Sequence, residues 1–210
     1  ALSNVLEVCT LAKASAETVE LEKVRSEVNE KFKQFSAQGL RTLGVAYKEV
    51  NPATTVRKED EAGMTFIGFL LLCDPLRPDI VETLRRLRNL RISLKFITGD
   101  NALVAANVSR QAGLVDAQIM TGSELRQISN VALIQRAANT QVFAEVEPNQ
   151  KERIILALKK AGNVVGYIGD GINDASALHA ADVGISVANA VDVAKEAAEI
   201  VLLEKDLAVL

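Results

Sequence analysis

The fold class of the chain is decided by the stretch Ile168-Gly169-Asp170-Gly171-Ile172-Asn173-Asp174-Ala175-Ser176-Ala177-Leu178. A β-branched run over 164–168 leads into its polar loop, an alanine-rich segment follows, and a second apolar run occupies 183–187. The apolar runs have the composition of buried strands, and the segment between them has that of a helix. This order of strand, loop, helix and strand is typical of an α/β fold with a parallel sheet.

The loop carries two carboxylates, Asp170 and Asp174, at the carboxyl end of a predicted strand, where parallel sheets form their sites. Gly169 and Gly171 allow the backbone to turn tightly and to approach a ligand closely. Mg²⁺ is commonly held by one or two carboxylates with waters and phosphate oxygens, so the spacing predicts a magnesium site. Asn173 or Asp174 as a simple helix cap is the alternative interpretation. Spacing alone leaves both open.

The composition indicates a globular protein: 210 residues, 49% hydrophobic and 24% charged, with a net charge of −3. This weak acidity gives no reason to expect a nucleic-acid partner. The two cysteines, Cys9 and Cys73, lack metal-type spacing, which favours a reducing, cytosolic compartment. The longest apolar run, 66–73, is far shorter than the ~20 residues of a membrane helix, so these residues are predicted to be soluble.

Patterning predicts a small N-terminal piece, residues 1–62, and a main domain, residues 63–210. The start of the chain, without an initiator Met or a leader, is typical of a cut within a longer protein. In the small piece we expect a helix over 17–38, a strand over 40–50 and a polar loop over 51–63. In the main domain, strands are expected at 64–73, 92–97, 141–144, 164–168 and 183–187, and helices from Pro78 and at 102–112, 123–139 and 148–161.

Two other places on this predicted sheet suit an anion. Thr98-Gly99-Asp100 ends one strand and opens a helix, where a hydroxyl, backbone N–H groups and the helix dipole favour a phosphate. Taken alone, capping of that helix by Asp100 or Asn101 explains the pattern better. Lys151 lies in the first turn of its helix, where a cation opposes the dipole at a cost of roughly 0.3–1 kcal/mol. An anion opposite Lys151 explains this placement, and an exposed lysine is the alternative.

A hydroxyl, a lysine and paired carboxylates together match a phosphoryl-transfer site. In such a site Thr98 and Lys151 hold the phosphoryl group and the carboxylate loop holds Mg²⁺. The reaction also needs a nucleophile, usually an aspartate at the end of a strand. Neither Asp-x-Asp nor Asp-Lys-Thr-Gly-Thr occurs in the sequence, so the usual nucleophile motifs are missing from these residues.

Residues 169–178 resemble the hinge motif Gly-Asp-Gly-x-Asn-Asp-x-Pro-Ala-Leu of P-type ATPases, which are ATP-driven ion pumps of the haloacid dehalogenase superfamily. Three more stretches look like motifs of that family and follow its order: 74–77, 98–100 and 143–151. The resemblance covers essentially the whole chain. Residues 39–43 are similar to the end of the family's nucleotide-binding domain, residues 1–9 to the stretch after that domain's Lys-Gly-Ala motif, and residues 192–207 look closest to the magnesium-transporting branch.

The resemblance implies a three-layer, Rossmann-like parallel sheet flanked by helices, as in haloacid dehalogenases, preceded by the end of an α+β nucleotide-binding domain. It implies that Mg²⁺ and ATP are the cofactors. Asp170 would hold the catalytic Mg²⁺ with Asp174 close behind it, and Asn173 would belong to the same catalytic loop. Thr98 and Lys151 would contact the phosphoryl group. The residues implied on the nucleotide side are Arg41, Asp74, Arg77, Gly99 and Asp100.

The sequence departs from the family pattern at three positions. Ser176 replaces the usual Pro of the hinge motif, and Leu76 replaces the second Pro of Asp-Pro-Pro-Arg. Glu145 stands where Arg is common, which reverses a charge near the predicted cleft and puts nucleotide affinity in question. His179, the one histidine, is expected at a surface position of the helix.

The leading hypothesis is a catalytic fragment from the cytoplasmic face of a membrane cation pump. Its partners would be the actuator and transmembrane domains of the same pump, and the transported cation would bind elsewhere. The fragment alone is not expected to turn over. The alternatives are a stand-alone phosphatase of the same superfamily and a non-catalytic module that binds Mg²⁺ or nucleotide. Because the family's nucleophile strand is central to its sheet, its absence is expected to leave a gap between strands and a marginally stable chain.

Overall fold

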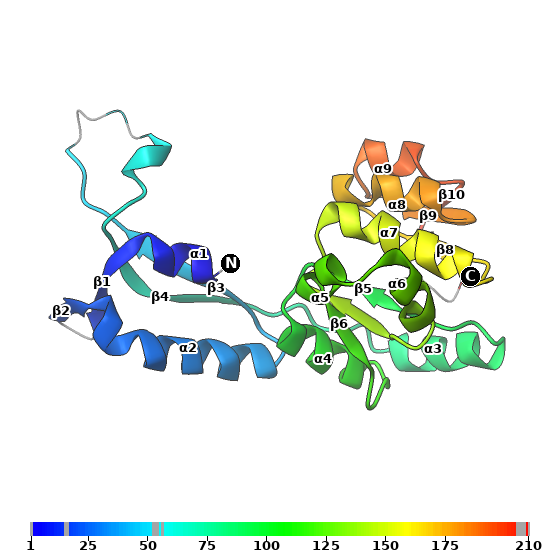
Figure 1. Cartoon of the computed structure of the whole chain (residues 1–210), viewed down its shortest axis with the longest axis horizontal. Coiled ribbons are helices and arrows are strands. Elements are labelled where there is room, and N and C mark those ends of the chain that lie inside the picture. The colour runs from blue at the N-terminus through cyan, green and yellow to red at the C-terminus, as the bar shows by residue number, and fades with distance from the viewer. Residues whose placement is uncertain (1, 15–16, 52–54, 56, 205–208, 210) are drawn as a thin grey trace. The chain divides into compact units, whose positions relative to one another are not determined.

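The computed structural model divides the chain into two compact units, unit 1 (residues 1–75) and unit 2 (residues 76–210) (Figure 1). It describes residues 2–14, 17–51, 55, 57–204 and 209. Parts of the predicted loop (52–54 and 56) and of the stretch compared with the magnesium-transporting branch (205–207) lie outside the described residues. In the part of the chain that is described, no helix is long and apolar enough to cross a membrane.

Unit 1 is built on a mixed sheet with the strand order β2-β1-β4-β3. β4 lies between β1, to which it is parallel, and β3, to which it is antiparallel. These ladder hydrogen bonds tie β4 to unit 1, so the compact unit extends to Pro75, beyond the boundary predicted after residue 62. The elements in chain order are α1 (Leu2–Glu7), β1 (Cys9–Ala14), β2 (Glu17–Glu20), α2 (Leu21–Ala37), β3 (Arg41–Tyr47), a 3₁₀ turn (Lys58–Asp60) and β4 (Met64–Leu72).

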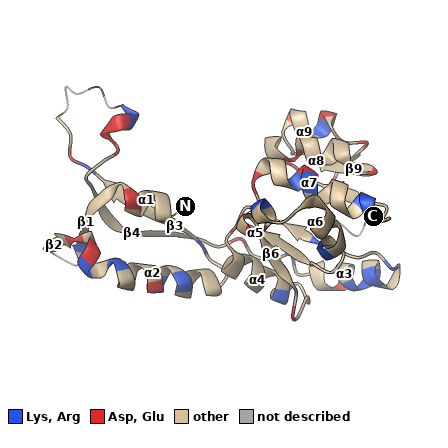
Figure 2. Ribbon diagram, viewed as in Figure 1, with Lys and Arg blue, Asp and Glu red and all other residues tan. Residues whose placement is uncertain are grey.

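The core of unit 1 is formed by two helices packed against this sheet. Leu2 and Leu6 of α1 and Leu21 and Val28 of α2 are buried together with Phe66 of β4. The outer face of α2 carries ion pairs between basic and acidic side chains one turn apart, visible as neighbouring blue and red segments in Figure 2. Exposed pairs of this kind add little stability, so burial of the apolar face is what holds α2 in place.

Unit 2 alternates helices with short parallel strands. Within the described residues, these strands form two three-stranded sheets in the orders β5-β7-β6 and β10-β9-β8. The strands are β5 (Phe96–Ile97), β6 (Ile119–Thr121), β7 (Val142–Ala144), β8 (Gly166–Ile168), β9 (Val183–Val187) and β10 (Ile200–Leu202). The helices are α3 (Ile80–Asn89), α4 (Ala102–Gln111), α5 (Gly122–Gln127), α6 (Asn130–Ala137), α7 (Pro148–Lys160), α8 (Ala175–Ala180) and α9 (Asp192–Glu196), with a 3₁₀ turn at Ile172–Asp174.

Helices cover both faces of the β5-β7-β6 sheet. On β7, Phe143 belongs to the core cluster that contains Ile154 of α7, whereas Val142 and Ala144 pack with Ala105 of α4. Successive residues of a strand point to opposite faces, so the two clusters lie on opposite sides of the sheet. The predicted α/β fold, with parallel sheets flanked by helices, is confirmed.

β5 and β8 each stand at the end of a sheet, so each has an edge that pairs with no other described strand. That a further strand belongs between these two edges, as the gap expected from the sequence implies, stays a prediction. One core cluster nevertheless spans both sheets, because Phe143 of β7, Tyr167 of β8 and Ile185 of β9 all belong to it. Unit 2 is therefore a single packed body whose sheet is interrupted.

Several strands differ from the sequence predictions. β6 and β10 were not predicted, because three residues are too few for an alternating pattern to be recognised. β2 occupies 17–20, where the start of a helix was predicted, and pairs there with β1. Its Thr18 and Val19 are β-branched, which favours extended backbone once a partner strand is available. β5 is confined to Phe96–Ile97 within the predicted strand 92–97.

Helix α3 is followed by an arginine in the left-handed region, Arg91, with φ of 63°. The N–H groups of Arg91 and Ile92 donate to the carbonyls of Arg88 and Leu87, at 2.9 and 3.0 Å. Glycine is preferred at such a helix end because a Cβ is unfavourable there. We expect Arg91→Gly to raise the free energy of unfolding by about 1 kcal/mol in urea denaturation. Arg91→Ala keeps the Cβ and should show no such gain; a less stable glycine variant would contradict the assignment.

Asp182, between α8 and β9, makes stability depend on pH. Its carboxylate accepts a hydrogen bond from the Val165 N–H at 2.8 Å and pairs with Lys159 at 3.1 Å. These contacts lower the pKa of Asp182 in the folded chain, so their stabilisation is present above the ordinary aspartate pKa and is lost as the pH falls through the lowered one. We expect Asp182→Asn to melt at a lower temperature than the wild type at pH 7.

The difference between these two proteins should shrink below about pH 4, where the wild-type aspartate also loses its charge. Asp192→Asn is a matched control, since the Asp192 side chain is 92% exposed and lies 3.5 Å from its lysine partner. If the melting temperature of Asp182→Asn stays below that of the wild type by a constant amount down to acid pH, the charge of Asp182 does not contribute to stability.

Candidate active site

The loop after β8 folds back on itself around the side chain of Asp174. A Cβ at Gly169 would lie 2.5 Å from the Cβ of Asp174, so glycine is required for this close approach. The 3₁₀ turn at Ile172–Asp174 then leads directly into α8. The predicted order of strand, glycine-rich loop and helix is confirmed, with the loop at the carboxyl end of β8.

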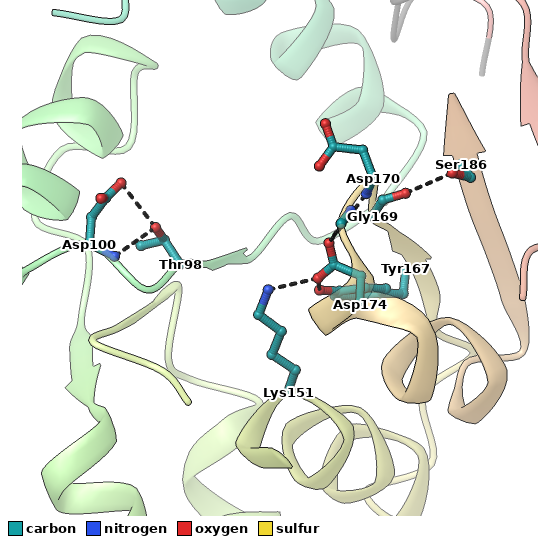
Figure 3. Close-up of polar contacts among 9 residues, drawn as sticks. Thr98, Asp100, Lys151, Tyr167, Gly169, Asp170, Asp174 and Ser186 are labelled. Atoms are coloured by element: carbon teal, nitrogen blue, oxygen red, sulfur yellow. Dashed lines mark hydrogen bonds and ion pairs between the residues drawn. The ribbon is translucent and has the colours of Figure 1, made fainter. Parts of the chain in front are cut away.

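Asp174 is buried, with 7% of its surface exposed, and its carboxylate accepts four hydrogen bonds. Its Oδ1 accepts from Lys151 Nζ at 2.7 Å and from the Tyr167 hydroxyl at 2.6 Å (Figure 3). Its Oδ2 accepts from the backbone N–H groups of Asp170 at 3.2 Å and Gly171 at 3.0 Å. Each oxygen therefore receives two donors, as a buried carboxylate requires.

The charge states in this cluster follow from its contacts. Burial alone would raise the pKa of Asp174, but the hydrogen bonds from Lys151, Tyr167 and the Gly171 N–H outweigh it, and the pKa is lowered. Asp174 is thus a carboxylate at neutral pH. Burial, followed by the hydrogen bond to Asp174 and the charges of Asp174 and Asp170, raises the pKa of the Tyr167 hydroxyl. Tyr167 therefore stays protonated and acts as the donor.

Lys151 has the anionic neighbour that its unfavourable place in the helix predicted. It lies in the first turn of α7, and its side chain points from that helix to Asp174 (Figure 3). The ion pair is largely buried, with 15% of the Lys151 and 11% of the Asp174 side chain exposed. The anion opposite Lys151 is thus a carboxylate of the chain, and the alternative of an exposed, unpaired lysine is wrong.

Asp170 differs from Asp174 in what surrounds its carboxylate. The Asp170 side chain is exposed and points away from the Lys151–Asp174 pair (Figure 3), and no described residue donates to it. Its backbone is fixed: the Val191 N–H donates to the Asp170 carbonyl at 3.1 Å, and the Gly169 N–H donates to the Ile185 carbonyl at 3.0 Å. An exposed carboxylate on a held backbone is a suitable ligand for a hydrated Mg²⁺.

Fit to a magnesium ion can be judged from the donors that the loop offers. Among the described residues, no group of three or more His, Cys, Asp or Glu side chains is arranged to hold a metal. Mg²⁺ needs fewer, because it usually retains several waters and takes one or two carboxylates with substrate phosphates. Asp170 fits that requirement. The Asp174 carboxylate already receives four donors, so its predicted role as a metal ligand stays a prediction.

The Thr98 junction forms a second polar group after β5. The Thr98 hydroxyl donates to Asp100 Oδ2 at 3.2 Å and accepts from the Asp100 N–H at 3.1 Å (Figure 3). Gly99 is exposed at the turn. Asn101, rather than Asp100, caps helix α4, because its Oδ1 accepts from the N–H groups of Leu103 and Val104. The capping interpretation of this junction is therefore correct for Asn101.

Glu145 bonds a third N-terminal N–H group of α4. Its Oε1 accepts from the Ala102 N–H at 3.3 Å, and its own N–H donates to the Asp100 carbonyl at 2.8 Å. Its φ of 56° is left-handed, which is unusual for a residue with a side chain. Three N–H groups at this helix end, those of Ala102, Leu103 and Val104, are thus already bonded to the chain's own side chains, and Glu145 brings a negative charge there.

The other predicted residues are placed as follows. Asn173 is exposed within the 3₁₀ turn, and His179 is exposed on α8, as predicted for the histidine. Arg77 lies 3.5 Å from Asp79 in an exposed ion pair at the start of unit 2. Arg41, the first residue of β3, and Asp74, after β4, are both exposed in unit 1. Their predicted nucleotide contacts stay predictions.

Two residues in this cluster were not singled out from the sequence. Tyr167 stands on β8, and Ser186, fully buried on β9, donates its hydroxyl to the Gly169 carbonyl at 2.9 Å. Both lie in apolar runs whose pattern predicts core positions. A hydroxyl inside such a run is the one available signal, because a buried hydroxyl requires a hydrogen-bond partner.

Comparison with known proteins identifies the family of the chain. The model of the haloacid dehalogenase-like hydrolase family matches residues 8–182, and the chain belongs to that family. It is 42% identical to a magnesium-transporting P-type ATPase of Salmonella typhimurium and 40% identical to one of Escherichia coli, in both cases over the whole chain. A calcium-transporting ATPase of Yarrowia lipolytica is 35% identical over 88% of the chain.

The resemblance to P-type ATPases is thereby confirmed. The chain spans 24% of the length of the magnesium-transporting relatives and 20% of the calcium-transporting one. These relatives are named as ATPases that transport magnesium or calcium, and the family model is that of a hydrolase. The chain is thus similar to one region of these transporting ATPases.

Gly169→Ala tests the close approach around Asp174. We expect the methyl group to displace Asp174 and to lower the free energy of unfolding in urea by about 1–3 kcal/mol, the usual cost of overpacking. Gly166→Ala, on the strand β8 that precedes the loop, is the matched control, since its Cβ would meet its nearest atom, the Val183 carbonyl oxygen, at an ordinary 3.8 Å. Equal effects of the two substitutions would contradict the assigned geometry.

Proposed function

We propose that these residues belong to a P-type cation pump and form most of its phosphorylation domain, together with the end of its nucleotide-binding domain. In that pump a phosphoryl group passes from ATP to an aspartate outside this chain, and the cycle drives cation transport. The observation that carries the proposal is the buried Lys151–Asp174 pair beside the exposed Asp170 at the carboxyl end of β8. The similarity to magnesium-transporting ATPases favours that branch.

The Lys151 ammonium would screen the phosphoryl group. It is held at 2.7 Å from Asp174, so its position is fixed before a ligand arrives, and little reorganisation is needed on binding. Thr98 would donate its hydroxyl to a phosphoryl oxygen in place of Asp100. Asn173, exposed in the same loop as Asp170, would contact the ligand from the α8 side.

Asp170 would hold Mg²⁺, which supplies Lewis-acid neutralisation of charge on the phosphoryl oxygens when it is bound. Its backbone is anchored through the Asp170 carbonyl, so the carboxylate projects from a fixed point. Asp174 would act mainly by holding Lys151 and the loop. This division of roles gives the two aspartates of the motif different tasks.

We expect nucleotide contacts from Arg41, Asp74 and Arg77, whose side chains are exposed, and from Gly99 and Asp100 after β5. Glu145 would weaken phosphate binding at the start of α4, because it bonds the Ala102 N–H and adds a negative charge. The actuator and transmembrane domains of the pump would be its partners, with this region on the cytoplasmic face.

The test is Mg²⁺-dependent binding of beryllofluoride, a phosphate mimic, to a longer chain that restores an upstream Asp-Lys-Thr-Gly-Thr segment. Binding is followed by ¹⁹F NMR. We expect binding to require Mg²⁺ and to be lost in Asp170→Asn, which removes the metal ligand, and in Lys151→Ala, which removes the screening cation.

Two controls isolate the site from general effects of charge. Lys160→Ala removes an exposed lysine from the end of the same helix, and Asp192→Asn removes an exposed aspartate from α9; both should bind as the wild type does. A folded longer chain that binds no beryllofluoride would overturn the proposal and favour a regulatory module instead.

A further inference from the structure

Tyr167 contributes the shortest hydrogen bond of the Asp174 cluster. Its hydroxyl donates to Asp174 Oδ1 at 2.6 Å, and 8% of the residue is exposed. Its ring belongs to the main core cluster of unit 2, together with Phe143 and Ile185. Phenylalanine would fill the same space, so packing explains the ring of Tyr167 and leaves its hydroxyl unexplained.

The hydroxyl and Lys151 share one carboxylate oxygen. Oδ1 receives both side-chain donors, while Oδ2 receives the N–H groups of Asp170 and Gly171. The carboxylate is therefore held at both ends: β8 and α7 fix Oδ1, and the loop fixes Oδ2. Without the hydroxyl, Oδ1 would have Lys151 as its one described donor, and that end of the carboxylate would be held by a single flexible side chain.

A second buried hydroxyl holds the same loop from the neighbouring strand. Ser186 on β9 donates to the Gly169 carbonyl at 2.9 Å (Figure 3). Tyr167 thus acts on the side chain at the end of the loop, and Ser186 on the backbone at its start. Of the two, Tyr167 is the one connected to the lysine.

We propose that Tyr167 is a positioning residue of the phosphoryl site: its hydroxyl fixes the Asp174 carboxylate, which in turn holds the Lys151 ammonium in place. This inference rests on the function proposed above for Lys151. Tyr167 does not touch the phosphoryl group. It acts through Asp174, whose Oδ1 accepts hydrogen bonds from both Tyr167 and Lys151.

The first test uses the 210-residue chain itself and measures hydrogen exchange of the lysine ammonium groups by ¹⁵N NMR. In Tyr167→Phe we expect exchange at Lys151 to be about tenfold faster. The reason is that the Asp174 carboxylate, which pairs with Lys151, loses its hydrogen bond from the Tyr167 hydroxyl. Lys95 is an internal reference, since its Nζ donates to the carbonyls of Ala138 and Thr140 at 2.8 and 2.6 Å, away from this cluster. Tyr47→Phe, which changes a half-exposed tyrosine in unit 1, should alter neither lysine.

Faster exchange at Lys151 with Lys95 unchanged supports a positioning role. Unchanged exchange at Lys151, or equal acceleration at both lysines, would overturn it, because the second result indicates general loosening.

If Tyr167→Phe does not fold, the hydrogen bond of Tyr167 is tested in the Tyr47→Phe chain instead. The sequence has two tyrosines and no tryptophan, so ultraviolet absorption then reports Tyr167 alone. Adding Lys151→Met to this chain should shift the Tyr167 absorption, because Lys151 and Tyr167 donate to the same oxygen of Asp174. An unchanged absorption would contradict that shared acceptor.

The second test measures beryllofluoride binding by the longer chain. We expect Tyr167→Phe to bind about tenfold more weakly than the wild type, and Tyr47→Phe to bind equally well. Equal affinity in Tyr167→Phe would overturn the positioning role. If the wild-type longer chain binds no beryllofluoride, the proposed function fails, whereas the exchange measurement still decides whether Tyr167 holds Lys151 through Asp174.

Discussion

A buried carboxylate is the constraint on which the rest of unit 2 depends. Asp174 lies inside the protein, and its charge is tolerable there because four donors from three segments meet it. To meet this need, β8 supplies a hydroxyl, α7 supplies a lysine, and the loop turns two backbone N–H groups inward. The requirement at Gly169 follows from the same contact. The position of Asp170, whose carboxylate is exposed, follows as well, because its backbone N–H is one of the donors to Asp174.

Much of this could be predicted from the sequence because the relevant signals are local. The apolar runs around the Asp-Gly loop indicated parallel strands, and the loop lies at a strand end as expected. Lys151 was recognised from a conflict between its charge and the helix dipole, and the conflict is resolved by a partner 23 residues further along the chain. A residue that is locally unfavourable pointed to a distant contact, although not to the identity of the contact.

What could not be predicted depends on contacts between distant segments. Nothing in the composition of β4 shows that it pairs with β1 and β3, since an apolar run fits either unit. β6 and β10 are strands because of the partners beside them, not because of any pattern of their own. Tyr167 looks like a core residue in the sequence, and its hydroxyl acquires meaning once Asp174 has folded back against it. Glu145 was recognised as an unusual charge, but its left-handed backbone was not foreseeable.

The way the chain passes between its two units has a consequence for how such proteins diversify. Within these 210 residues, units 1 and 2 are contiguous, so the backbone crosses from one to the other once, at Pro75–Leu76. No described strand of unit 1 pairs with a described strand of unit 2. Among the described strands, an exchange of residues 2–75 would therefore cut no hydrogen-bonded strand pair. Substitutions within unit 1 therefore leave the hydrogen bonds around Asp174 untouched, since every donor to that carboxylate comes from unit 2.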